Sequence, residues 1–114
     1  IGHEAGDFLL QNLAKQFNDT LETHGKIARI GGDEFVFFIH NLNSWENIVS
    51  KLLHKASLPL AYENHILKVS ASIGVYQVDI SCDETISEIL KKADTAMYQA
   101  KKRGKNQYCI FNSL

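Results

Sequence analysis

Two adjacent carboxylates follow a pair of glycines in the segment Arg29-Ile-Gly-Gly-Asp-Glu-Phe35. Hard cations such as Mg²⁺ prefer carboxylate oxygens as ligands, so Asp33 and Glu34 are candidate metal ligands. Gly31 and Gly32 have no side chains, which lets a phosphate group approach the backbone closely. The same four residues are also typical of an ordinary solvated turn. Taken alone, the segment is better explained as a plain turn than as a metal and phosphate site.

Two further charged segments have a functional and a structural interpretation. A basic cluster could neutralise phosphates, or it could simply complement the negative end of a helix. Asp7, in the segment Gly2-His-Glu-Ala-Gly-Asp7, could bind a ligand, or it could be an acid favoured in the first turn of a helix. Taken singly, each is better explained by the structural interpretation. The basic cluster consists of Lys101, Lys102, Arg103 and Lys105.

Several classes of protein are excluded. The chain has no GxxxxGK[ST] or GxGxxG motif, which excludes a P-loop or Rossmann nucleotide site, and its histidines lack the HExxH spacing. A net charge of −1 over 114 residues gives no basis for binding nucleic acid or an anionic membrane. No apolar run is long enough to span a membrane. Cys82 and Cys109 lack CxxC spacing and are expected to be free thiols in a reducing, intracellular setting.

Apolar residues at helical spacing predict three helices. The first covers residues 6–23, and the second follows Asn43 or Ser44 as N-cap. The third begins after Thr85, which forms a capping box with Glu88, and ends at Gly104. The residues expected to face the core are Leu10, Leu13, Ala14, Phe17 and Leu21 in the first helix, Ile48, Val49, Leu52, Leu53 and Ala56 in the second, and Ile86, Ile89, Leu90, Ala93, Met97 and Ala100 in the third.

Strand patterns lie between these helices. Residues 26–30 and 35–40 flank the glycines and predict a tight hairpin. Both faces of its second strand are apolar, so that strand is expected to be central and covered on both sides. Residues 58–62 and 66–78 predict another hairpin, turning at residues 63–65, and residues 107–111 predict a short last strand. The order predicts one α+β domain over residues 1–114, with a mostly antiparallel central sheet flanked by helices.

The motifs, taken together, resemble the GGDEF family of diguanylate cyclases in their order and spacing. The resemblance covers nearly the whole chain and implies a nucleotidyl-cyclase-like fold with a ferredoxin-like core. The segments that carry it are Gly2-His3, Gly6-Asp7, Arg29-Ile-Gly-Gly-Asp-Glu-Phe35, Val69-Ser-Ala-Ser-Ile-Gly-Val75, Ala93-Asp-Thr-Ala-Met-Tyr-Gln-Ala-Lys101 and Gly104-Lys-Asn106.

The resemblance implies that two monomers face each other, each with one GTP, as a transient homodimer. The 3′-hydroxyl of each GTP attacks the α-phosphate of the other, which gives cyclic di-GMP and pyrophosphate. Asp33 then corresponds to a catalytic metal ligand and candidate general base, and Glu34 to its neighbouring catalytic and metal carboxylate, with Mg²⁺ or Mn²⁺ as the cofactor.

Substrate-binding roles follow from the same resemblance. Gly31 and Gly32 form the turn that the nucleotide approaches, and Asp7 accepts hydrogen bonds from the guanine edge, which adenine cannot offer. His3 is a weaker candidate, for which packing is an equal alternative. Lys101 and Lys105 match phosphate-contacting positions, although relatives more often carry arginine at the second, which adds a bidentate fork.

Two departures from the family pattern lead to expectations. The upstream strand that carries a metal-binding aspartate, a lysine and an asparagine in relatives is missing, so this fragment alone is expected to be weakly active or inactive. The Arg-x-x-Asp site for product inhibition has Glu22 and Gly25 in its place. Because an acid at residue 22 would repel the phosphates of cyclic di-GMP, no such inhibitory site is expected.

A binding module is the main alternative to an enzyme. The end of the chain, Gly104-Lys-Asn-Gln-Tyr-Cys-Ile-Phe-Asn112, resembles the junction of composite proteins in which an EAL phosphodiesterase domain follows. In that case the domain would hold GTP without cyclising it and would regulate its neighbour. Attached sensory and EAL domains are the expected partners. A cytoplasmic location is expected, without direct membrane contact by this domain; the sequence leaves open whether the parent protein is tethered to a membrane.

Overall fold

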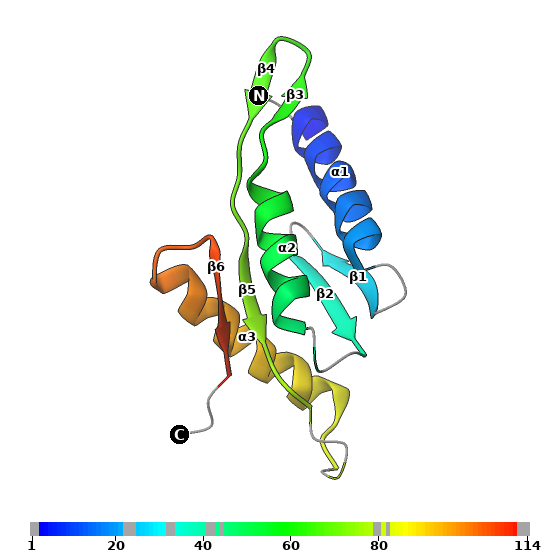
Figure 1. The fold of residues 1–114 in the computed structure, drawn as a ribbon, viewed down its shortest axis with the longest axis vertical. Helices are drawn as coiled ribbons and strands as arrows, with labels where there is room; N and C mark the ends of the chain where they lie inside the picture. Colours follow the sequence, from blue (N-terminus) through cyan, green and yellow to red (C-terminus); the bar gives the residue numbers. More distant parts are fainter. Residues whose placement is uncertain are drawn as a thin grey trace. The chain divides into compact units, whose positions relative to one another are not determined.

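Helices alternate with short strands along the chain (Figure 1). The computed structural model describes residues 3–21, 25–31, 34–40, 43, 45–78, 81 and 83–111. The chain divides into two units, Ile1–Val69 and Ser70–Leu114. The first holds α1 (His3–Leu21), β1 (Gly25–Gly31), β2 (Glu34–Ile39), α2 (Trp45–Ser57), β3 (Leu60–Tyr62) and β4 (His65–Leu67), and the second holds β5 (Ser72–Val75), α3 (Ile86–Lys102) and β6 (Gln107–Ile110). The predicted α+β class is confirmed.

α1 begins at His3, three residues before its predicted start. Gly6 does not interrupt the helix, since one glycine costs only about 1 kcal/mol relative to alanine. Ala5 in the same turn is buried. Phe17 and Leu21 are buried as predicted. The predicted end, at residue 23, lies outside the described residues.

β1 and β2 form the predicted hairpin. They pair antiparallel from Gly25 opposite Ile39 to the end of the ladder, and α1 packs on β1. Phe17 of α1 meets the rings of Phe35 and Phe37 edge-on, with centroids 5.7 and 5.4 Å apart. The opposite face is covered only in part, since Val36 is half-buried and Phe38 is 49% exposed. Packing on α1 therefore involves one face of β2.

α2 begins at Trp45, directly after the two predicted N-cap candidates. Asn43 lies in a turn, and Ser44 is outside the described residues. The predicted buried face is confirmed at Ile48, Val49, Leu52 and Ala56, whereas Leu53 is half-buried and Trp45 joins the buried set.

The second hairpin is shorter than predicted. His65 pairs with Tyr62, which leaves a two-residue turn in which Glu63 has a φ of 53°. The prediction of one strand over residues 66–78 is wrong, because β4 ends at Leu67 and β5 begins at residue 72. The two segments belong to different ladders, because β4 pairs antiparallel with β3 and β5 pairs parallel with β6.

The second unit is built on a parallel pair of strands with α3 packed against β5 and β6. Gly74 permits this approach, since a Cβ placed on it would lie 2.0 Å from the carbonyl oxygen of Ala93. The predicted buried face of α3 is confirmed at Ala100, whereas Ile86 is 69% exposed. Ala96, which was not predicted, is also buried. The other predicted residues are half-buried: Ile89, Leu90, Ala93 and Met97.

The capping box predicted at the start of α3 is present. The backbone N–H of Glu88 donates to Thr85 Oγ1 at 3.1 Å, and the backbone N–H of Thr85 donates to Glu88 Oε1 at 3.1 Å. The bond from the Thr85 backbone, together with the Thr85 hydroxyl, lowers the pKa of Glu88 below 4.5. The ionised carboxylate therefore stabilises the helix start.

We expect this stabilisation to depend on pH. Since the pKa is lower in the folded state, the contribution is complete above about pH 4.5 and is lost as the pH falls through the folded pKa. Hydrogen exchange, corrected for intrinsic rates, should show the first turn of α3 losing protection between pH 6 and pH 3. In the Glu88→Gln variant the amide can still accept the bond but does not titrate, so its protection should change less. An equal change in both proteins would contradict the assignment.

A polar cluster ties the segment before α3 to the helix. Glu84 accepts a hydrogen bond from the Tyr76 hydroxyl and forms an ion pair with Lys92. The bond to Glu84 raises the pKa of Tyr76 and also that of Lys92. Phe111 meets the Tyr76 ring edge-on at 5.6 Å, so the cluster also reaches the chain beyond β6.

No helix in the described part of the chain is both long enough and apolar enough to cross a bilayer.

Candidate functional site

The β1–β2 hairpin positions the paired carboxylates. Its ladder ends with Gly31 opposite Glu34, and the register shifts between Arg29 and Gly31, as in a β-bulge. Glu34 is exposed at the first residue of β2. Gly32 and Asp33, which join the strands, lie outside the described residues. The hairpin thus presents the Glu34 carboxylate to solvent, next in sequence to Asp33.

The donor chemistry at this hairpin fits a divalent cation such as Mg²⁺. No group of three or more metal-ligating side chains occurs among the residues whose placement is described. Mg²⁺ is commonly held by one or two carboxylates, with substrate phosphates and waters as its other ligands. Asp33 and Glu34 supply carboxylates of that kind, so the sequence-predicted pair is compatible with the ion.

Asp7 lies on α1, exposed and in the second turn rather than the first. The first-turn acid of the helix is Glu4. The structural interpretation of Asp7, an acid favoured by the helix N-terminus, is therefore weakened, because this effect falls off within the first turn. His3 begins the helix, and its side chain lies outside the described residues.

An aromatic contact holds this end of α1 against the second hairpin. The rings of Phe8 and Tyr62 lie 5.0 Å apart between centroids. Burial raises the pKa of the Tyr62 hydroxyl, and the nearby carboxylates of Glu63 and Glu4 raise it further. The residue next to Asp7 is thus packed on a strand, which fixes the part of the helix that carries the Asp7 carboxylate.

The two candidate phosphate-binding lysines lie at the end of α3. Lys101 is exposed in the last turn of the helix, and Lys105 is exposed just beyond it. Lys105 has a φ of 63°, and the side-chain amide of Gln107 donates to its carbonyl oxygen at 3.2 Å. Sequence reasoning missed Gln107, although a glutamine directly after Gly-Lys-Asn, with two donors for a turn, was a usable signal.

The predicted site residues fall into two groups. Gly31 and Glu34 are brought together by strand pairing, and Asp7 belongs to the same unit. Lys101 and Lys105 are brought together at the end of α3, in the other unit.

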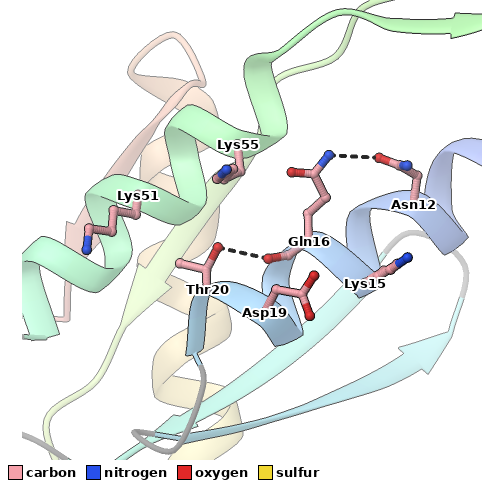
Figure 2. A pocket seen from close by; sticks show the side chains of 7 residues that line it. All are labelled: Asn12, Lys15, Gln16, Asp19, Thr20, Lys51 and Lys55. Carbon is pink, nitrogen blue, oxygen red and sulfur yellow. Dashed lines mark hydrogen bonds between the residues drawn. The ribbon is translucent and has the colours of Figure 1, made fainter.

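A groove lies between α1 and α2 (Figure 2). Its volume is about 620 Å³, and two internal hydrogen bonds, from Gln16 to Asn12 and from Thr20 to the Gln16 carbonyl, occupy part of its polar lining. None of the predicted site residues whose placement is described lines this groove. The lining residues are Asn12, Lys15, Gln16, Asp19, Thr20, Lys51 and Lys55.

Comparison with known proteins decides the family. Residues 1–107 match the family described as diguanylate cyclase, GGDEF domain. The chain belongs to the GGDEF family. The solved structure of an EAL/GGDEF domain protein from M. capsulatus is similar to this GGDEF domain with a TM-score of 0.87 and 34% identity, covering 98% of this chain and 74% of that one.

Curated relatives place the GGDEF domain within longer proteins. It is 38% identical over 116 residues to the bifunctional diguanylate cyclase/cyclic di-GMP phosphodiesterase MucR of Pseudomonas aeruginosa, covering 98% of this chain and 16% of that protein. It is 32% identical over 114 residues to diguanylate cyclase A of Treponema denticola, covering 96% of this chain and 30% of that protein. The chain thus spans less than a third of these relatives' length.

Proposed function

We propose that this GGDEF domain binds GTP and, as part of its full-length protein, condenses two GTP into cyclic di-GMP. The observation that carries the proposal is the β1–β2 hairpin, which ends with Gly31 opposite Glu34 and leaves the Glu34 carboxylate exposed beside Asp33. The family match over residues 1–107 and the relative named diguanylate cyclase A support it.

The proposed reaction forms one P–O bond for each GTP that is attacked. The 3′-hydroxyl of one GTP attacks the α-phosphorus of the other, the bond from the α-phosphorus to the bridging oxygen breaks, and pyrophosphate leaves. Asp33 takes the hydroxyl proton as general base. Mg²⁺ or Mn²⁺ held by Asp33 and Glu34 would offset the negative charge of the phosphates. A second transfer of the same kind closes the ring.

The remaining residues bind and orient the nucleotide. Asp7, exposed on α1, accepts hydrogen bonds from the ring N–H and the amine of guanine. Gly31 and Gly32 leave room for phosphate beside the backbone. Lys101 and Lys105 contribute two exposed cations to the phosphates. Holding two GTP in attack geometry requires two half-sites, so we propose a transient homodimer in the cytoplasm, where GTP is available.

Attached domains are part of the proposal. The name of MucR joins cyclase and phosphodiesterase activities in one protein, and this GGDEF domain covers 16% of its length. We infer that the full-length protein here also carries further domains, among them sensory and EAL domains, which control dimerisation and consume the product.

The test is product formation by the full-length protein supplied with GTP and Mg²⁺. Cyclic di-GMP would be identified by chromatography and mass spectrometry, and removal of the metal with a chelator should stop its formation. GTP binding by a dimeric protein without any product would instead support a GTP-sensing module.

A further inference from the structure

The turn after α3 holds Lys105 in a backbone conformation that lysine rarely adopts. Gly104, Lys105 and Asn106 have φ values of 116°, 63° and 50°. Glycine adopts positive φ without strain and asparagine tolerates it, but lysine does so at a cost. Such strain persists only where the surrounding structure enforces it. The structure must therefore contain contacts that hold Lys105 in place.

The helix end explains the first of these residues. The N–H of Gly104 donates to the carbonyl of Lys101 at 3.3 Å, and the N–H of Lys105 donates to that of Ala100 at 3.1 Å. This pattern is a Schellman motif, which requires a left-handed residue at the position of Gly104. It does not require one at Lys105 or Asn106.

The side chain of Gln107 supplies the missing constraint. Its Nε2 donates to the carbonyl oxygen of Arg103 at 2.9 Å and to that of Lys105 at 3.2 Å. A Cβ placed on Gly104 would lie 3.9 Å from the same nitrogen, so the amide lies over the turn. The backbone of Gln107 is anchored by pairing with Ser72 in the β5–β6 ladder. The amide thus links the carbonyl groups on both sides of Gly104 to the sheet.

We propose that Gln107 is a positioning residue that fixes the direction in which Lys105 leaves the end of α3, so that its ammonium group meets a nucleotide phosphate. The proposal rests on the phosphate-binding role proposed for Lys105. A lysine side chain is flexible, and the orientation of its backbone limits where the ammonium group can reach. With the turn held, less conformational freedom is lost when the phosphate binds. Gln107 itself does not touch the nucleotide.

The test compares dissociation constants of GTP and guanosine for variants of the full-length protein. Lys105→Ala should weaken GTP binding about tenfold, the loss of one charge-assisted contact, and leave guanosine binding unchanged. Gln107→Met, which keeps the side-chain length but removes both donors, should weaken GTP binding roughly threefold to fivefold, also without an effect on guanosine. Gln99→Met is the matched control, because Gln99 is exposed near the same helix end and its side chain makes no hydrogen bond within the described part of the chain.

The double variant separates positioning from a general structural effect. If Gln107 acts through Lys105, Gln107→Met should have no further effect on GTP affinity once Lys105 is alanine. The same loss in both backgrounds, or an equal loss for guanosine, would overturn the proposal. If Gln107→Met binds GTP normally while Lys105→Ala binds GTP more weakly, the positioning role of Gln107 is overturned and the proposed function is unaffected. No effect of Lys105→Ala would instead reject the phosphate-binding role itself, and with it the positioning role.

Discussion

Replacing Gly74 with alanine is expected to speed hydrogen exchange in α3 roughly 100-fold, the effect of severe overpacking between a helix and a strand. The added Cβ would lie 2.0 Å from the carbonyl oxygen of Ala93 and 2.3 Å from the backbone nitrogen of Met97. Both are backbone atoms, so no side-chain rotation relieves the contact and α3 must move away from β5. Hydrogen exchange measured by mass spectrometry on α3 peptides of the full-length protein would detect the loss.

Gly6→Ala is the matched control for this experiment. A Cβ at Gly6 would meet nothing within 4 Å, and the residue lies inside a helix, where alanine is more favourable than glycine. The control should leave exchange in α3 unchanged. If Gly74→Ala left it unchanged as well, the close approach of α3 to β5 would be wrong.

Replacing Asp7 with asparagine should weaken GTP binding about 100-fold, since one of the two hydrogen bonds becomes repulsive and the other loses the charge of its acceptor. The asparagine oxygen can still accept one bond, but its amide N–H groups face the donors of guanine. ATP offers no matching pair of donors, so its affinity should change little. Dissociation constants of both nucleotides for the full-length protein measure the effect as a loss of selectivity.

Asp19→Asn provides a control on the same helix. Asp19 is exposed and lies on the groove between α1 and α2, away from Asp7 in the sequence. The Asp19→Asn substitution removes one negative charge from α1, as Asp7→Asn does. Any general electrostatic effect of α1 on the nucleotide would therefore appear in both variants. Equal losses in the two variants would reject a specific guanine contact by Asp7.

Local signals in the sequence predicted most of the elements correctly. The capping box at Thr85 and the glycine after α3 mark a helix whose ends are set by neighbouring residues, and both were confirmed. The hairpin around Gly31 was equally well marked, because a tight turn between apolar strands requires glycine. In these places the physical cause lies within a few residues of its effect.

The sequence-based predictions fail where residues distant in the chain determine strand pairing or burial. The pattern of residues 66–78 is continuous, but the structure pairs its first part with β3 and residues 72–75 with the distant β6. Ile86 fits the helical stripe but is exposed, whereas Ala96, which the stripe did not include, is buried where α3 packs on the strands.

The candidate site shows the same limit. Asp7 and Lys105 were singled out through the family motifs, whereas Gln107 was missed because its role depends on the geometry of a turn. Asp33 lies outside the described residues, so its catalytic role stays a prediction.

We expect the synthesis of cyclic di-GMP to depend on the GGDEF hairpin. The most direct measurement supplies the full-length protein and its Asp33→Ala variant with GTP and Mg²⁺ and quantifies cyclic di-GMP and pyrophosphate. We expect the unmodified protein to release two pyrophosphates for each cyclic di-GMP, and the variant to form no detectable product. Product formed equally by both proteins would contradict the assignment of the chemistry to the hairpin, and no product from a dimeric, GTP-bound unmodified protein would contradict the cyclase function.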